Sequence, residues 1–329
     1  MRFALLPVAL SLLAAAPSLA ADYKQVGTIA GPDGGWDYAS VDAPRNRLLV
    51  ARADGLMAVE LATHAVSTLV PAQGVHGAVI APNGIGVLAS GGAGGAVLFN
   101  AADGAVLATI PTGSKPDAVV YEPKSGLVAV MDNKGEGVAL IDPANKASVG
   151  TIAVEGRLEF AAADGAGQIF VNVEDKSELV VLDVPGRKVT AHHALPDCEK
   201  PTGIALDPKT RVLVSACANG KAIAVSANDG KVLATLPIGS HPDAVIFDEK
   251  NKRFLVPCGG DGVLTVISEK GSSLDVTGTV HTVERARLGA LDPATGKLYL
   301  PTADFPPAQP GERPAMVPGS FRILVLAQD

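Results

Sequence analysis

The chain has 329 residues, of which 47% are hydrophobic and 19% are charged, which excludes an intrinsically disordered protein. The formal net charge is −7. This charge excludes duplex nucleic acid as the expected partner, because a duplex binder needs Lys and Arg side chains that neutralise phosphates. The 36 glycines and 24 prolines favour many short strands joined by tight turns.

The first 20 residues have the pattern of a secretory signal peptide. A basic start precedes an apolar run over residues 3–16, and the small residues Ser18 and Ala20 come at the end of the pattern. The run is too short for a transmembrane anchor, and no second apolar span follows, so we expect no membrane span. We therefore predict cleavage near Ala20 and a periplasmic or secreted mature protein.

Beyond the leader, the chain repeats itself. The segment at residues 113–122 recurs at residues 239–248, and the 126 residues between the two starts equal three periods of 42. This period divides the chain into seven units. The same turn position recurs in every unit and is acidic in six of them: Asp42, Ala81, Glu122, Asp164, Asp207, Asp248 and Asp292.

Each unit alternates short apolar segments with turns that contain Gly, Asn or Asp. In the unit of Asp207, strands are predicted over residues 211–215, 222–226 and 232–236. Four strands in roughly 40 residues, without a helical period, are typical of a propeller blade. We predict that residues 21–329 form one all-β domain, a seven-bladed β-propeller with four-stranded antiparallel blades.

The two ends of the chain complement each other. The last unit has strands over residues 285–292, 297–302 and 321–327 but lacks a fourth, whereas residues 23–30 form a strand ahead of the first unit. Pairing these two ends closes the ring and removes a free sheet edge. The proline-rich insertion at residues 305–319 is expected to be an irregular surface loop or a cover over one face of the disc.

The repeated Gly-x-x-Pro-Asp-Ala-Val segment, at residues 113–119 and 239–245, resembles the YVTN-type β-propellers. The whole mature chain resembles the YncE-like proteins of that group. Three further segments are similar to stretches of the family: 198–203, 262–266 and 297–304. The resemblance implies an exported seven-bladed propeller with no settled reaction, because this fold hosts many functions.

The first strand of a propeller blade is innermost, so its start lies at the rim of the central channel. Counting five residues back from each turn position gives the rim residues: Asp37, His76, Asp117, Glu159, Thr202, Asp243 and Arg287. At the position two residues before each rim residue, most units have a basic side chain, as with Arg157 and Arg285. We predict that these side chains form a polar binding surface at the channel mouth.

Two interpretations of the rim stay open. The carboxylates of Asp37, Asp117, Glu159 and Asp243 could hold a divalent cation such as Ca²⁺, which takes oxygen ligands. The alternative is a water-filled channel in which the same residues form a solvated ion-pair network. No other cofactor is expected, since the chain lacks, for example, the Cys-x-x-Cys-His motif of c-type haem.

Three cysteines leave at least one thiol without an intramolecular partner. Cys198 lies in the loop that enters the blade of Cys217, which favours a Cys198–Cys217 disulfide. Cys217 and Cys258 occupy equivalent positions of adjacent blades, so their pairing is the alternative, and three free thiols are a third possibility.

Three functions are compatible with these observations. The first is a non-catalytic binding or scaffold module, expected to be a monomer, that presents its polar channel face to a periplasmic protein, peptide or small ligand. The second is a metal-dependent hydrolase of lactone or ester type, with His76 as base. The third, taken from similarity to quinoprotein-type propellers, is a redox accessory protein without cofactor residues of its own.

Overall fold

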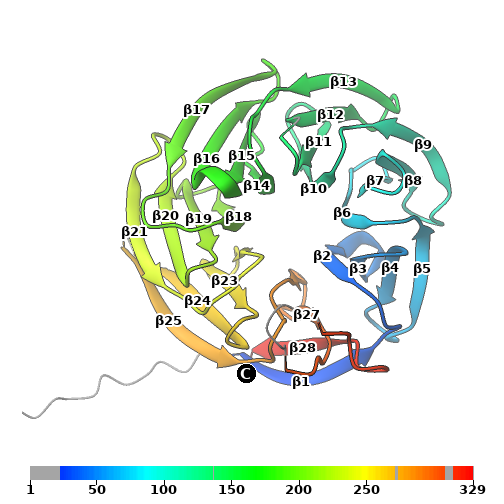
Figure 1. Cartoon of the computed structure of the whole chain (residues 1–329), viewed down its shortest axis with the longest axis vertical. Helices are drawn as coiled ribbons and strands as arrows, with labels where there is room; N and C mark the ends of the chain where they lie inside the picture. The colour runs from blue at the N-terminus through cyan, green and yellow to red at the C-terminus, as the bar shows by residue number, and fades with distance from the viewer. Residues whose placement is uncertain (1–22, 136, 271–272, 308–313, 329) are drawn as a thin grey trace, which may run out of the picture.

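The computed structural model describes residues 23–135, 137–270, 273–307 and 314–328. Within these ranges the strands form seven four-stranded antiparallel sheets, arranged radially in a ring (Figure 1). The predicted seven-bladed β-propeller is therefore confirmed. The predicted signal peptide, residues 1–20, lies outside the described residues. Across the described ranges there is no helix with the length and hydropathy needed to cross a membrane.

The first four blades follow one another along the chain, each built from the axis outward. Blade 1 contains β2 (Trp36–Asp42), β3 (Arg47–Arg52), β4 (Gly55–Glu60) and β5 (Val66–Pro71). Blade 2 contains β6 (Val75–Ile80), β7 (Ile85–Ser90), β8 (Gly95–Asn100) and β9 (Val106–Pro111). Blade 3 contains β10 (Pro116–Glu122), β11 (Leu127–Asp132), β12 (Val138–Asp142) and β13 (Ala147–Ile152). Blade 4 contains β14 (Leu158–Ala163), β15 (Gln168–Val173), β16 (Glu178–Asp183) and β17 (Lys188–Ala194).

The remaining blades keep this order until the last one. Blade 5 contains β18 (Pro201–Asp207), β19 (Val212–Cys217), β20 (Lys221–Ser226) and β21 (Val232–Pro237). Blade 6 contains β22 (Ile246–Asp248), β23 (Arg253–Cys258), β24 (Val263–Lys270) and β25 (Ser273–His281). Blade 7 contains β26 (Ala290–Leu291), β27 (Leu298–Thr302), β28 (Arg322–Gln328) and β1 (Tyr23–Ala30). In the described part of the chain, two short 3₁₀ turns follow strands: Ala43–Arg45 and Glu174–Lys176.

The first strand of the chain closes the ring. β1 pairs antiparallel with β28, from Tyr23 opposite Gln328 to Ala30 opposite Arg322, and Figure 1 shows the two strands side by side. The predicted closure is confirmed. The inner strand of this blade is shorter than expected, because the chain turns before it. The Ala286 N–H bonds the Val283 oxygen at 3.2 Å, the Arg285 backbone is left-handed, with φ of +65°, and pairing with β27 begins only at Ala290.

The core lies between the blades. All six residues of β3 are buried, since the middle strands are covered on both faces, whereas outer strands such as β9 are largely exposed. Apolar side chains from neighbouring blades pack together, as Leu98 of β8 does with Val128 and Val130 of β11 in one cluster. Each blade therefore buries its faces against its two neighbours.

The acidic turn residues stabilise the turns that identified the repeat. Asp207 accepts the backbone N–H of Lys209 at 2.8 Å, and Asp292 accepts that of Ala294 at 3.0 Å. A carboxylate that bonds the backbone two residues later closes a turn by itself. These residues are therefore structural.

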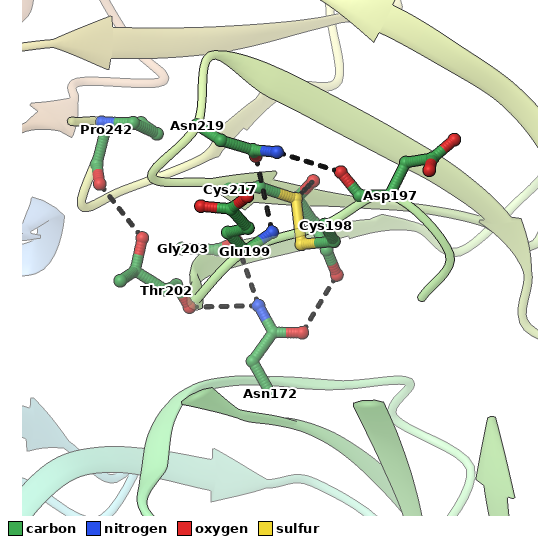
Figure 2. The surroundings of a disulfide bond; sticks show 10 residues. Asn172, Asp197, Cys198, Glu199, Thr202, Gly203, Cys217, Asn219 and Pro242 are labelled. Carbon is green, nitrogen blue, oxygen red and sulfur yellow. Dashed lines mark hydrogen bonds between the residues drawn. A yellow bond between two sulfur atoms is a disulfide. The ribbon is translucent and has the colours of Figure 1, made fainter. Parts of the chain in front are cut away.

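Cys198 and Cys217 form a disulfide with a Cα–Cα distance of 5.3 Å, and Cys258 is a buried free thiol. Figure 2 shows the bond above a hydrogen-bonded link between blades 4 and 5. In this link the side-chain amide of Asn172 donates to the backbone oxygen of Thr202 at 3.0 Å. The disulfide thus fastens the loop that enters blade 5.

Replacing both Cys198 and Cys217 with Ala is expected to lower the melting temperature by about 5 °C or more. A disulfide between residues 19 positions apart stabilises a protein by about 3 kcal/mol. Differential scanning calorimetry with and without a reductant measures the effect. The reductant should destabilise the native protein and the Cys258→Ala variant but not the double variant; an equal response of all three would contradict the assignment.

Candidate functional site

A β-bulge recurs where five of the inner strands begin. In blade 1, Trp36 pairs with Arg52 and Ala39 with Val50, so two inner residues face one residue of β3. The same shift occurs in β6, β10, β14 and β18. In each case the first residue inside the bulge is the predicted rim residue. A bulge re-aims its side chains, and this repeated irregularity sets the direction of the rim side chains.

The bulges of blades 1, 2 and 3 bring three side chains into contact. Nδ1 of His76 lies 2.7 Å from Oδ2 of Asp37 and 3.4 Å from Oδ1 of Asp117. The hydrogen bond to Asp37 raises the pKa of His76. Asp117 is only 7% exposed, and burial, together with the charge of Asp37, raises its pKa to about 7. We call these three residues the Asp–His–Asp cluster.

The two other rim carboxylates have different partners. Oδ2 of Asp243 lies 3.2 Å from Nε of Arg287, and burial raises the pKa of Asp243 to about 6 against the opposing effect of this arginine. Glu159 accepts a hydrogen bond from the Asn133 side-chain amide at 2.6 Å. Burial, followed by the charges of Asp117 and Asp243, raises the pKa of Glu159 to about 9.

Tyr38, the second residue in the bulge of blade 1, was not among the predicted site residues. Its ring packs against Phe160 with centroids 4.8 Å apart. Burial raises the pKa of its hydroxyl well above the usual value, and the charges of all four rim carboxylates add to the shift: Asp117, Asp243, Glu159 and Asp37. The four carboxylates are thus near one tyrosine, although they do not form one contact group.

Two predicted rim residues are engaged in structural contacts. The Thr202 hydroxyl donates to the backbone oxygen of Pro242 at 2.9 Å, as Figure 2 shows. Arg157 forms an ion pair with Glu174 at 2.5 Å. Both contacts join neighbouring segments of the rim, so these side chains support its shape.

Several polar turn residues on the same face also hold the loops that enter the inner strands. Asp132 accepts the backbone N–H of Lys115, and Asp261 accepts that of Ser240, both at 2.7 Å. A carboxylate that satisfies a loop N–H is not free to bind a ligand through the same oxygen. Much of the polar character of this face is therefore structural.

A pocket of about 720 Å³ opens beside the axis, between blades 6, 7 and 1. Its apolar wall combines Trp36 with side chains of the blade 7 insertion, since the Trp36 ring lies 6.3 Å from that of Phe305. Its polar lining includes three side chains that can carry positive charge: His241, Arg285 and Arg287. The described part of the insertion therefore forms one wall of a pocket at the channel face.

Arg285 is the cation of this pocket that is best placed for a ligand. Its guanidinium carbon lies 4.0 Å from the centre of the Phe305 ring, and no ion pair within the described ranges involves it. Arg287, by contrast, already pairs with Asp243. Sequence reasoning identified both arginines but missed Phe305 and Met316, whose contribution depends on how the insertion folds back.

The comparisons with known proteins identify the class of fold. The structure is similar to a chain in a crystal structure of the mitotic checkpoint complex, with a TM-score of 0.76 and 14% identity over 99% of this chain and 98% of that one. It is also similar to a chain of Kuenenia stuttgartiensis hydrazine synthase, with a TM-score of 0.71 and 13% identity over 84% and 95% of the two chains. No protein-family model and no curated protein sequence matches the chain. The chain is a seven-bladed β-propeller, a fold compatible with a binding or scaffold module.

Replacing Glu159 with Gln is expected to stabilise the protein in alkaline solution. Folded Glu159 keeps its proton up to about pH 9, whereas the unfolded carboxyl loses it above about pH 4. Its contribution to stability is therefore complete below pH 4 and falls as the pH rises toward 9. At pH 8 the variant should melt at least about 2 °C above the native protein.

The matched control is Glu155→Gln, because the Glu155 side chain is 94% exposed and the same change there should leave the melting temperature unaltered. Thermal melts of all three proteins from pH 5 to pH 8.5 measure the difference. A Glu159→Gln protein that melts lower than the native one at pH 8 would mean that Glu159 is ionised in the fold.

Proposed function

We propose that this propeller is a non-catalytic binding module whose ligand is a small organic anion with a flat apolar body. The observation that carries this proposal is the pocket beside the axis, where the Trp36 and Phe305 rings accompany Arg285 and Arg287. Ligand sites in proteins are mostly apolar concavities with a few polar groups that fix orientation. A ring that rests against the wall formed by Trp36 and Phe305, with a carboxylate toward Arg285, fits this pattern.

The charges of the pocket favour an anion over a neutral ligand. Asp33, one of its two acidic lining residues, already accepts the backbone N–H of Phe321 at 3.2 Å. Among the described residues, the Arg285 guanidinium lies against the Phe305 ring face and has no ion pair, so its N–H groups can meet a carboxylate. A charge-assisted hydrogen bond of this kind is stronger than one between neutral groups.

We further propose that the protein is exported and related to the YVTN-type, YncE-like propellers. The pattern of residues 1–20 supports export, and a Cys198–Cys217 disulfide suits an oxidising compartment such as the periplasm. The repeated Gly-x-x-Pro-Asp-Ala-Val segment supports the family. A periplasmic fraction that contains a chain beginning at Ala21 would agree with this proposal, and a cytoplasmic chain that keeps Met1 would contradict it.

A metal-dependent hydrolase of lactone or ester type is the second candidate. The observation that favours it is the Asp–His–Asp cluster at the axis, which offers donors for a cation. Glu159 and Asp243 lie near the cluster but have their own partners, Asn133 and Arg287. Hydrolysis of a test lactone that disappears after treatment with a chelator would favour this candidate over the binding module.

Replacing Arg285 with Gly is expected to weaken the binding of an aromatic carboxylate such as 1-naphthoate by at least about tenfold. The chain contains a single Trp, Trp36, so quenching of its fluorescence reports occupancy of the pocket. Glycine adopts the left-handed backbone of Arg285 without strain, so the variant should fold normally.

Arg157→Ala is the matched control, because this arginine occupies the equivalent repeat position but lies outside the pocket. It should bind 1-naphthoate within about twofold of the native protein, since it loses no contact with the ligand. The neutral analogue 1-naphthalenemethanol should bind more weakly than 1-naphthoate. Equal affinities of the native and Arg285→Gly proteins for 1-naphthoate would overturn the proposed site.

A further inference from the structure

Three consecutive blades direct one nitrogen and two oxygen donors to a common point at the axis. The ligand atoms of Asp37, His76 and Asp117 all lie within 4.8 Å of one another. Each comes from the same position of a β-bulge, in β2, β6 and β10. The three donors are thus held by the rigid inner strands of the propeller rather than by flexible loops.

The inner strands of blades 2 and 3 approach closely at this point. Gly77 follows His76, and a Cβ atom there would lie 3.2 Å from the backbone oxygen of Asp117 and 3.5 Å from the Tyr38 ring. A side chain at this position would require the neighbouring strand to shift by a few tenths of an ångström. Glycine therefore permits the approach of β6 and β10 that joins His76 to Asp117.

One of the donor spacings matches that of a zinc site. Two ligands at about 2.1 Å from a tetrahedral Zn²⁺ ion lie roughly 3.4 Å apart, and His76 Nδ1 is 3.4 Å from Asp117 Oδ1. The 2.7 Å contact between His76 and Asp37 is a hydrogen bond, which a small side-chain rotation would open for an ion.

The two carboxylates of the cluster also favour a bound cation. Asp37 and Asp117 share one imidazole, while the guanidinium of Arg287 is paired with Asp243. Asp117 is 7% exposed, so water compensates little of its charge. A divalent ion would compensate the charge of both carboxylates at once.

We propose that Asp37, His76 and Asp117 bind a transition-metal ion of the Zn²⁺ type. The imidazole nitrogen distinguishes this set from a calcium site, which takes six to eight oxygen ligands. The proposed site thus differs from the four-carboxylate Ca²⁺ site expected from the sequence, because it has three residues and one of them supplies a nitrogen ligand. Glu159 and Asp243 lie outside it, with Asn133 and Arg287 as their partners.

This site does not depend on the anion pocket or on catalysis. Three protein ligands leave one tetrahedral position open to water or to another small molecule. The Trp36 ring lines the pocket, and Asp37 follows it in β2, so the two sites adjoin along one strand. Loss of one site by mutation should leave the other intact.

Isothermal titration of the untagged, chelator-treated protein with ZnCl₂ tests the proposal. We expect one Zn²⁺ per chain and weaker binding of CaCl₂. His76→Asn and Asp117→Asn should each weaken Zn²⁺ binding by at least about 100-fold, since loss of outer-shell groups alone costs roughly 10–100-fold. Glu159→Gln, Asp243→Asn and Arg285→Gly should bind Zn²⁺ within about threefold of the native protein.

The absorption spectrum of the Co²⁺-loaded native protein provides a readout that does not depend on any variant. Intense visible bands of a four-coordinate site are expected, and they should disappear when Zn²⁺ is added. A Ca²⁺ affinity above that for Zn²⁺, lost in Glu159→Gln and Asp243→Asn, would overturn the proposal in favour of the four-carboxylate site. Absence of both Zn²⁺ binding and Co²⁺ bands would overturn it altogether.

Discussion

Each of the five bulged inner strands has one more residue at its start than the strand beside it can pair. The extra residue leaves the hydrogen-bond ladder, and the bulge re-aims the side chains at this point. In the first three blades this geometry brings Asp37, His76 and Asp117 into contact. The chemistry of the channel mouth depends on this local departure from regular pairing, which is repeated because the blades are repeated.

The mouth is divided into two chemically different regions. Blades 1 to 3 direct carboxylates and an imidazole to the axis, where a cation would be stabilised. Blades 6, 7 and 1 surround a pocket with aromatic walls and arginines, where an anion would be stabilised. The ion pair between Asp243 and Arg287 links the two regions. Arg287 lines the pocket, whereas the charge of Asp243 raises the pKa of Tyr38, as do the charges of Asp37 and Asp117.

Burial gives the rim carboxylates unequal properties despite their equivalent positions. Glu159 and Asp117 are removed from water next to other carboxylates, so their pKa values rise to about 9 and about 7. Thr202, at the same position of blade 5, has its hydroxyl bound to the backbone of Pro242. Repeat symmetry thus supplies equivalent geometry, while the neighbours of each residue decide whether it is charged, neutral or structural.

The repeat allowed the rim positions to be predicted, because residues at equivalent positions of radially arranged blades lie at similar distances from the common axis. It could not predict the pocket. Trp36 was visible as the residue before Asp37, but its partner Phe305 belongs to an insertion with no counterpart in other blades. The shortened β26 was also missed, since the chain turns before it, where the Ala286 N–H bonds the Val283 oxygen, and no Gly, Pro, Asn or Asp at residues 283–287 marks that turn.

The sequence by itself determined the number of blades, their strand order and the closure by residues 23–30, because periodic apolar segments and turn residues act locally and repeat. Only the tertiary structure decided which rim side chains meet and which are occupied elsewhere. That outcome depends on distances of a few ångströms between strands of different blades, such as the approach of Gly77 to Asp117, and no local pattern specifies such distances.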